Sequence, residues 1–416
     1  MIQINRHQLS NGLRIIHNED CSTQMVAINL LYDVGARDEE PTRTGFAHLF
    51  EHLMFGGSVN IPDYDTPVQE AGGENNAWTT NDITNYYITL PKQNAEIGFW
   101  LESDRMLGLS FSPQSLEIQR QVVMEEFKQR NLNQPYGDAN HLMRSMVYKV
   151  HPYRWPTIGL ELSHIEEATL DEVKRFFYSH YAPNNAVLAV AGNISFERVV
   201  TLAEKWFASI PSREIAKRSL PQEPPQTTIR RMAVERDVPV DALYMNFRTC
   251  PRNHPDYYAV DMLSDLLANG RSSRLITSLV KEKQVFSHID AFICGSRDEG
   301  VLEINGKLSL GVTPEDAEKE VWQVLERLKY ASGEPFETEL EKVKNRFESG
   351  QTFKNMNFLN NAVNMAYFEL LTGRAEEMND EVNRYRSVSA EDINHVAATI
   401  FVPENCSVLY YKRKKN

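Results

Sequence analysis

Apolar and polar residues follow two periods along this chain, one typical of strands and one typical of helices. Residues 25–32 and 186–191 are apolar, β-branched runs of strand length. Residues 93–107 and 113–131 repeat apolar positions at the spacing of a helix with one buried face. Ser112-Pro113 marks the start of the second of these helices. The pattern predicts strands in pairs and helices in clusters, which is an α+β fold.

The order of predicted elements repeats after the middle of the chain. A polar segment with several prolines at residues 211–230 has the composition of a linker. Strand and helix patterns follow it in the same succession as before it. We therefore expect two homologous domains, residues 1–210 and 231–416, joined by this linker.

One predicted helix carries titratable groups inside an apolar pattern. In the segment Gly45–Gly57, His48 and His52 are four residues apart, so their imidazoles would lie on one helix face, about 5–6 Å from each other. Glu51 projects near the same face, and burying such groups is costly unless something pairs with them. Two core histidines bonded to backbone are the simplest interpretation. However, H-x-x-E-H is a zinc signature, that of the inverzincins, and we predict a zinc site.

Charge and composition exclude several classes of protein. The chain has 416 residues, with 44 Lys and Arg against 57 Asp and Glu, and this net charge of −13 argues against a nucleic-acid binder. The four cysteines are scattered without a C-x-x-C pair, so neither a disulfide framework nor a thiolate zinc site is expected. No apolar run reaches the roughly 18 residues of a membrane span, and no signal-like segment begins the sequence. We expect no membrane span and a cytoplasmic location.

Four segments of the chain resemble the M16 family of zinc peptidases, the pitrilysin-like inverzincins that include the mitochondrial processing peptidase. They are a H-x-x-E-H helix, the strand that follows it, a downstream helix and a stretch with S-S-R-L, at residues 46–55, 72–79, 120–127 and 267–275. The resemblance extends over essentially the whole chain. It implies two homologous domains, each with a mostly antiparallel sheet and packed helices, and one Zn²⁺ per chain.

The resemblance also implies roles for individual residues. The third zinc ligand of the family corresponds to Glu126, which lies 74 residues after His52, and not to the neighbouring Glu125. Without the resemblance, both glutamates and Lys128 could equally form a solvated helix face. Two histidines and one glutamate would leave a zinc position open for water, with Glu51 as the general base.

Two further sites follow from the same resemblance. Asn76, Ala77 and Trp78 fall where the family binds an extended peptide along a sheet edge; a simple turn is the other interpretation of this stretch. Gln119 stands seven residues before Glu126, where many members carry a second glutamate. A neutral amide at this position would alter the surroundings of the zinc.

The run Lys281–His288 departs from the family more strongly, because it lacks the arginine and tyrosine that often contact substrate. We expect this chain to supply the zinc site and a related M16-like subunit, in a homodimer or heterodimer, to complete the active site. The predicted function is a zinc-dependent metalloendopeptidase that cleaves extended peptides or unfolded segments. A catalytically inactive structural subunit of a larger complex is the main alternative, and a non-peptidase zinc hydrolase is another.

Overall fold

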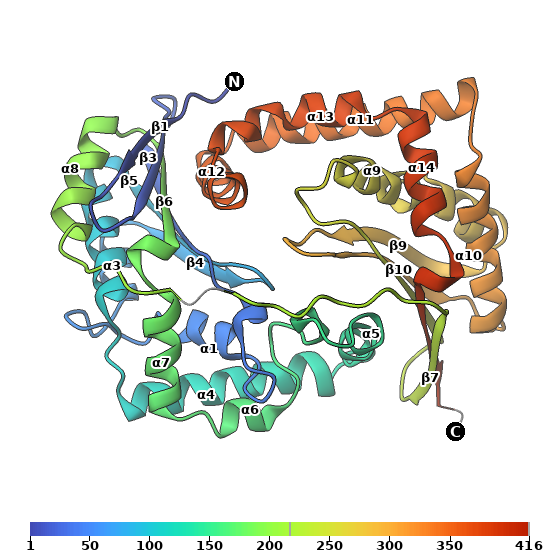
Figure 1. Ribbon diagram of the computed structural model, residues 1–416, viewed down its shortest axis with the longest axis horizontal. Coiled ribbons are helices and arrows are strands. Elements are labelled where there is room, and N and C mark those ends of the chain that lie inside the picture. The colour runs from blue at the N-terminus through green and yellow to red at the C-terminus, as the bar shows by residue number, and fades with distance from the viewer. Residues whose placement is uncertain (216–217, 415–416) are drawn as a thin grey trace. The chain divides into compact units, whose positions relative to one another are not determined.

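The computed structural model describes residues 1–215 and 218–414 (Figure 1). Its residues form two compact units, and each unit combines segments from both halves of the chain. Unit 1 consists of residues 1–128, 155–220 and 352–380, and unit 2 of residues 129–154, 221–351 and 381–416. The predicted linker at 211–230 includes residues 216–217, which lie outside the described residues, and the domain boundaries proposed from the sequence stay a prediction.

The sheet of unit 1 has six strands in the order β1-β2-β6-β3-β5-β4. Only the β2–β6 pair is parallel, and the other neighbours are antiparallel. Strand β4 lies at one edge, paired with β5 on one side only. The strands are β1 (Asn5–Gln8), β2 (Arg14–Glu19), β3 (Met25–Tyr32), β4 (Glu74–Thr79), β5 (Thr84–Pro91) and β6 (Ala186–Gly192).

The sheet of unit 2 has five strands in the order β7-β11-β8-β10-β9. Strands β2 to β6 of the first sheet have the same arrangement, β2-β6-β3-β5-β4: in both sets of five strands the first in the chain lies at one end, beside the last. This neighbouring pair is parallel in both, β7–β11 in the second sheet and β2–β6 in the first. The predicted α+β fold with two mostly antiparallel sheets is therefore confirmed. The strands are β7 (Arg230–Arg236), β8 (Ala242–Arg248), β9 (Phe286–Cys294), β10 (Val301–Leu308) and β11 (Cys406–Arg413).

Helices on one face of the first sheet form the main core of unit 1, where Phe50, Phe99, Phe177 and Phe207 pack with the sheet. Several of these helices begin at side-chain caps: the hydroxyl of Ser112 accepts a hydrogen bond from the N–H of Ser115. The helices of this part are α1 (Phe46–Leu53), α2 (Asp65–Glu70), α3 (Ala95–Leu107), α4 (Pro113–Phe127), α6 (Leu162–Glu166), α7 (Leu170–His180) and α8 (Phe196–Phe207).

Each sheet is covered on its other face by a helix from the opposite half of the chain. Helix α12 (Phe358–Thr372) packs Met365 and Phe368 against the first sheet (Figure 1). Helix α5 (Ala139–Val147) packs Met143 and Met146 against β8 and β11 of the second sheet. Strand β3 shows why both faces of the sheet are covered, since its residues are mostly apolar and are buried along almost its whole length.

The remaining helices of unit 2 enclose its largest core, built on Phe247, Leu263 and Leu325. Residues Ile276–Glu282 form the π-helix η6. No helix of the described residues is both long enough and apolar enough to pass through a membrane. The other helices are α9 (Tyr257–Ala268), α10 (Pro314–Lys329), α11 (Glu334–Asn355), which ends in unit 1, α13 (Glu381–Ser387) and α14 (Ala390–Ile400).

Candidate metal centre

Helix α1 carries His48, Glu51 and His52, and a buried carboxylate holds its first turn. Glu39 accepts hydrogen bonds from the N–H of Gly45 at 2.9 Å and from the N–H of Ala47 at 2.8 Å. These donors belong to the helix start, where backbone N–H groups lack partners within the helix. Burial raises the pKa of Glu39, while the two N–H donors favour its charged form. The sequence analysis missed Glu39, because the only signal is an acidic residue several positions before the helix.

Helix α4 lies beside α1 and brings Glu126 to the two histidines (Figure 1). The Oε2 atom of Glu126 is 3.6 Å from Nε2 of His48 and 3.3 Å from Nε2 of His52. The Glu126 side chain is 20% exposed, whereas that of Glu125 is 57% exposed and bonds to Lys128. Of the two neighbouring glutamates, only Glu126 joins the histidines.

The distances between these three side chains fit a shared metal ion. Zinc bonds of about 2.0–2.2 Å in a tetrahedron place neighbouring ligand atoms about 3.4 Å apart. The observed separations of 3.3 and 3.6 Å lie close to this value. Both are longer than the roughly 2.7–3.2 Å of a good hydrogen bond between nitrogen and oxygen. Two imidazoles and one carboxylate are also the donor set of several catalytic zinc sites, which keep a fourth position for water.

No second cluster of this kind occurs in the part of the chain that the structure describes. His48, His52 and Glu126 are the only group of three or more histidine, cysteine or acidic side chains there whose potential ligand atoms all lie within 4.8 Å of one another. The predicted trio is thus brought together by two helices, α1 and α4, which begin at Phe46 and at Pro113.

Glu51 lies on the same helix as the two histidines and contacts the edge strand of the sheet. Its Oε2 atom accepts a hydrogen bond from the hydroxyl of Thr79, at 2.7 Å. Thr79 is the last residue of β4. The sequence analysis did not single out Thr79, since nothing in its local sequence shows which helix faces the strand end.

The three residues predicted to bind substrate all lie on β4. Asn76 is exposed, while Ala77 and Trp78 are half-buried, and the Trp78 ring packs near that of Tyr87. The N–H of Ala77 donates to Oδ1 of Asn76 at 2.8 Å. An edge strand of this kind can accept a further strand. The simple-turn interpretation of this stretch is wrong, because residues 74–79 form a regular strand paired with β5.

Gln119 lies two turns before Glu126 on α4 and is half-buried. Its amide nitrogen would lie 3.8 Å from a Cβ atom placed on Gly56, so the two residues are neighbours. Among the described residues, Gln119 makes no hydrogen bond to His48, His52 or Glu126. Any influence of Gln119 on a bound metal would therefore pass through space or through water.

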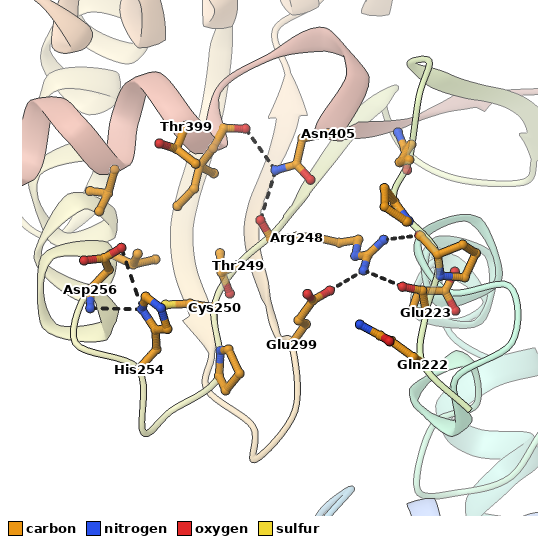
Figure 2. Close-up of a pocket in the computed structure, with 17 residues that line it drawn as sticks. Gln222, Glu223, Arg248, Thr249, Cys250, His254, Asp256, Glu299, Thr399 and Asn405 are labelled. Atoms are coloured by element: carbon orange, nitrogen blue, oxygen red, sulfur yellow. Dashed lines mark hydrogen bonds and ion pairs between the residues drawn. The ribbon is translucent and has the colours of Figure 1, made fainter. Parts of the chain in front are cut away.

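Unit 2 contains a separate cavity of about 620 Å³ (Figure 2). On one side Arg248 donates to the carbonyl of Pro224 and pairs with Glu299, so its charge is used to hold the segment at residues 222–226. On the other side, burial raises the pKa of Cys250 to about 11, which keeps it a protonated thiol at neutral pH. A protonated thiol is a poor nucleophile and a poor metal ligand. The contacts of Arg248 in this cavity are therefore structural, and Cys250 is held as a neutral thiol.

Comparison with known families places both halves of the chain in one family. A family model described as "Insulinase (Peptidase family M16)" matches residues 14–159. A second, described as "Peptidase M16 inactive domain", matches residues 167–347. The first match includes all the residues predicted to bind metal, water or substrate.

Full-length similarity to individual proteins agrees with these matches. The chain is 28% identical to "Zinc protease PqqE" of Helicobacter pylori, over 97% of this chain and 91% of that protein. It is 24% identical to "Uncharacterized zinc protease YmxG" of Bacillus subtilis, over 96% of each chain. A crystal structure of a protease from Helicobacter pylori superposes with a TM-score of 0.92 at 27% identity, covering 99% of this chain and 100% of that one. The chain therefore belongs to peptidase family M16.

Proposed function

We propose that this protein is a zinc-dependent metalloendopeptidase. The observation that carries the proposal is the cluster of His48, His52 and Glu126, with Glu51 on the same helix. These three side chains would hold the zinc, which supplies Lewis-acid polarisation of the scissile carbonyl and lowers the pKa of a bound water. Glu51 acts as the general base, since its carboxylate takes a proton from the attacking water and returns it to the leaving amine.

The substrate of this reaction is an extended peptide or an unfolded segment. The edge of β4 has a paired neighbour on one side only, so a peptide can add to it as a further antiparallel or parallel strand. Asn76, Ala77 and Trp78 would line this track, and Thr79 at its end contacts Glu51. Main-chain hydrogen bonds require the substrate to be extended, which excludes a segment that is folded into a helix.

A related M16-like subunit, identical or different, is proposed to complete the active site. The segment at Lys281–His288 has no arginine or tyrosine to offer a substrate, and its Lys283 is bonded to Gln323 and paired with Glu320. A different subunit that carries this arginine and tyrosine would supply these contacts, whereas an identical copy would have to supply them from another segment. If the partner is a different subunit, the isolated chain, shown to be homogeneous, should bind zinc yet cleave peptides slowly. Peptide cleavage by the isolated chain at ordinary metalloprotease rates would contradict this part of the proposal.

The alternative is a catalytically inactive M16-like structural subunit. The description of the second matched domain as inactive is compatible with it, but that match covers residues 167–347 and not the metal cluster. A subunit with no catalytic task has no need of the complete set His48, Glu51, His52 and Glu126, and this favours the peptidase. The names of the relatives as zinc proteases support the same choice.

The direct test is hydrolysis of unstructured, internally quenched peptides by the zinc-loaded protein and its Glu51→Gln variant. We expect the variant to retain zinc and to lose activity by about 10²-fold or more, as for loss of a general base. Glu125→Gln, a glutamate on α4 that faces solvent, is the matched control and should cleave like the wild type. Measurable cleavage at equal rates by the wild type and Glu51→Gln would contradict the assigned role of Glu51.

A further inference from the structure

The hydroxyl of Thr79 joins the proposed substrate strand to the proposed general base. The Thr79 Oγ1 atom lies 2.7 Å from Oε2 of Glu51. An ionised carboxylate can only accept hydrogen bonds, so the hydroxyl must be the donor. Hydrogen bonds to a charged acceptor are roughly twice as strong as those between neutral groups. This contact is therefore a firm connection between β4 and α1.

The contact limits the rotation of the Glu51 side chain. Glu51 is half-buried on α1, and a glutamate side chain gives up rotamer freedom when it is held in one position. A general base works only if its oxygen stays within hydrogen-bond distance of the water. Holding one carboxylate oxygen on Thr79 sets the orientation of the whole carboxylate, and proton transfer needs just one of its two oxygens.

The position of Thr79 on β4 links this orientation to the peptide track. Side chains alternate along a strand, so Ala77 and Thr79 share one face of β4. That face is the inner one, because Ala77 packs against the core that contains α1 residues Phe46 and Phe50. A peptide that pairs with the β4 edge would order the strand end, and through Thr79 it would also order Glu51.

We propose that Thr79 is a positioning residue that aligns Glu51 with a peptide bound along β4. This inference rests on the proposed function. It adds that substrate binding regulates the site, because Glu51 is best placed when substrate orders the end of β4. Segments that pair along β4 up to Thr79 are then cleaved faster than segments that bind only its far end near Glu74. Loss of the Thr79 hydroxyl should therefore lower kcat and leave the zinc affinity unchanged.

The variants Thr79→Val and Thr79→Ser test this role. Valine has nearly the shape of threonine but no hydroxyl, so kcat should fall by about tenfold or more while KM and zinc content stay unchanged. Serine keeps the hydroxyl and should restore kcat to within about threefold of the wild type. Thr89→Val is the matched control, since Thr89 is a half-buried threonine of β5 that pairs with Glu74 at the far end of β4 from Thr79. It should leave kcat unchanged.

Two measurements separate this proposal from the proposed function. If Thr79 acts through Glu51, Thr79→Val should add no further loss in a Glu51→Gln background. Crystal structures of zinc-loaded wild type and Thr79→Val give a readout that needs no activity, and the Glu51 carboxylate should leave its wild-type position in the variant. An unmoved carboxylate, a wild-type kcat, or a loss that serine does not restore would overturn the role of Thr79. Activity that survives Glu51→Gln would instead overturn the proposed function.

Discussion

Glu39 and Glu40 are adjacent acidic residues with opposite surroundings. Glu40 is exposed, while Glu39 is buried and bonded to two N–H groups at the start of α1. This helix presents both histidines, so its first turn sets the geometry of the proposed zinc site. Glu39 lies outside the H-x-x-E-H motif, yet its hydrogen bonds hold the start of the helix that carries the motif.

Replacing Glu39 by Gln should destabilise unit 1 by about 1–3 kcal/mol, because the amide turns a donor toward backbone N–H groups and leaves one of them unsatisfied. Urea unfolding monitored by circular dichroism measures this loss. Glu40→Gln is the matched control and should change the free energy of unfolding by less than about 0.5 kcal/mol. Equal stability of the two variants would show that the cap contributes nothing.

Individual helices and strands were predictable where their signals are local. The strand at 25–32 and the start of α4 at Ser112-Pro113 follow from β-branched runs and capping chemistry, and both are confirmed. Helix α1 ends at Leu53 with Met54 in a right-handed conformation as its C-cap, so the glycine pair Gly56-Gly57 follows the helix without capping it. The exchange of α5 and α12 between the units could not be predicted, because it depends on contacts between residues far apart in the chain. The sequence pattern of a helix does not say which sheet it covers.

Gln284 is a local exception that leads to a prediction for the segment before β9. Its φ is 52°, in the left-handed region that costs a residue with a side chain roughly 1–2 kcal/mol. Gln284→Gly should remove this strain and, after the entropy cost of glycine, raise the free energy of unfolding by up to about 1 kcal/mol. Thermal and urea unfolding measure the change.

The control for this prediction is Glu282→Gly in the neighbouring π-helix η6. Glycine at an ordinary helical position should lower the free energy of unfolding by about 1 kcal/mol. If both glycine variants were destabilised alike, the backbone at Gln284 would not be strained.

At the scale of the whole molecule, the two similar sheets and the three proposed metal ligands were predicted from different kinds of sequence evidence. The repeated order of elements predicted two similar sheets, and the shared strand order confirms them. His48 and His52 could be paired from helical spacing alone, whereas the choice of Glu126 over Glu125 required the family resemblance. The structure places Glu126 beside the histidines for a physical reason, since the buried face of α4 turns it toward α1. Its role as a zinc ligand stays a prediction.

Stability should also depend on pH through two histidines of unit 1, the buried His17 and the half-buried His180. Burial lowers the pKa of both His17 and His180 below 6.5, and both are bonded to backbone carbonyls, of Ile194 and of Phe176. Below about pH 6.5 the unfolded state then binds more protons than the folded state, so the free energy of unfolding falls as pH falls. Each histidine can account for about 1.4 kcal/mol per pH unit over this window.

Urea midpoints at pH 7.5 and 5.5 test this dependence, with EDTA present so that zinc does not contribute. The wild type should lose more stability between the two values than His17→Gln, whose side chain does not titrate. An identical loss in both proteins would mean that His17 does not contribute to the dependence.

The most direct test of the whole account is the zinc content of the purified chain, because metal binding requires neither substrate nor partner. We predict about one zinc ion per chain in the wild type and in Glu125→Gln, and a strongly reduced content in Glu126→Gln after the same dialysis. The two variants differ by one position on the same helix, so their comparison isolates the ligand. A wild type without zinc, or equal zinc in both variants, would contradict the proposed metal centre.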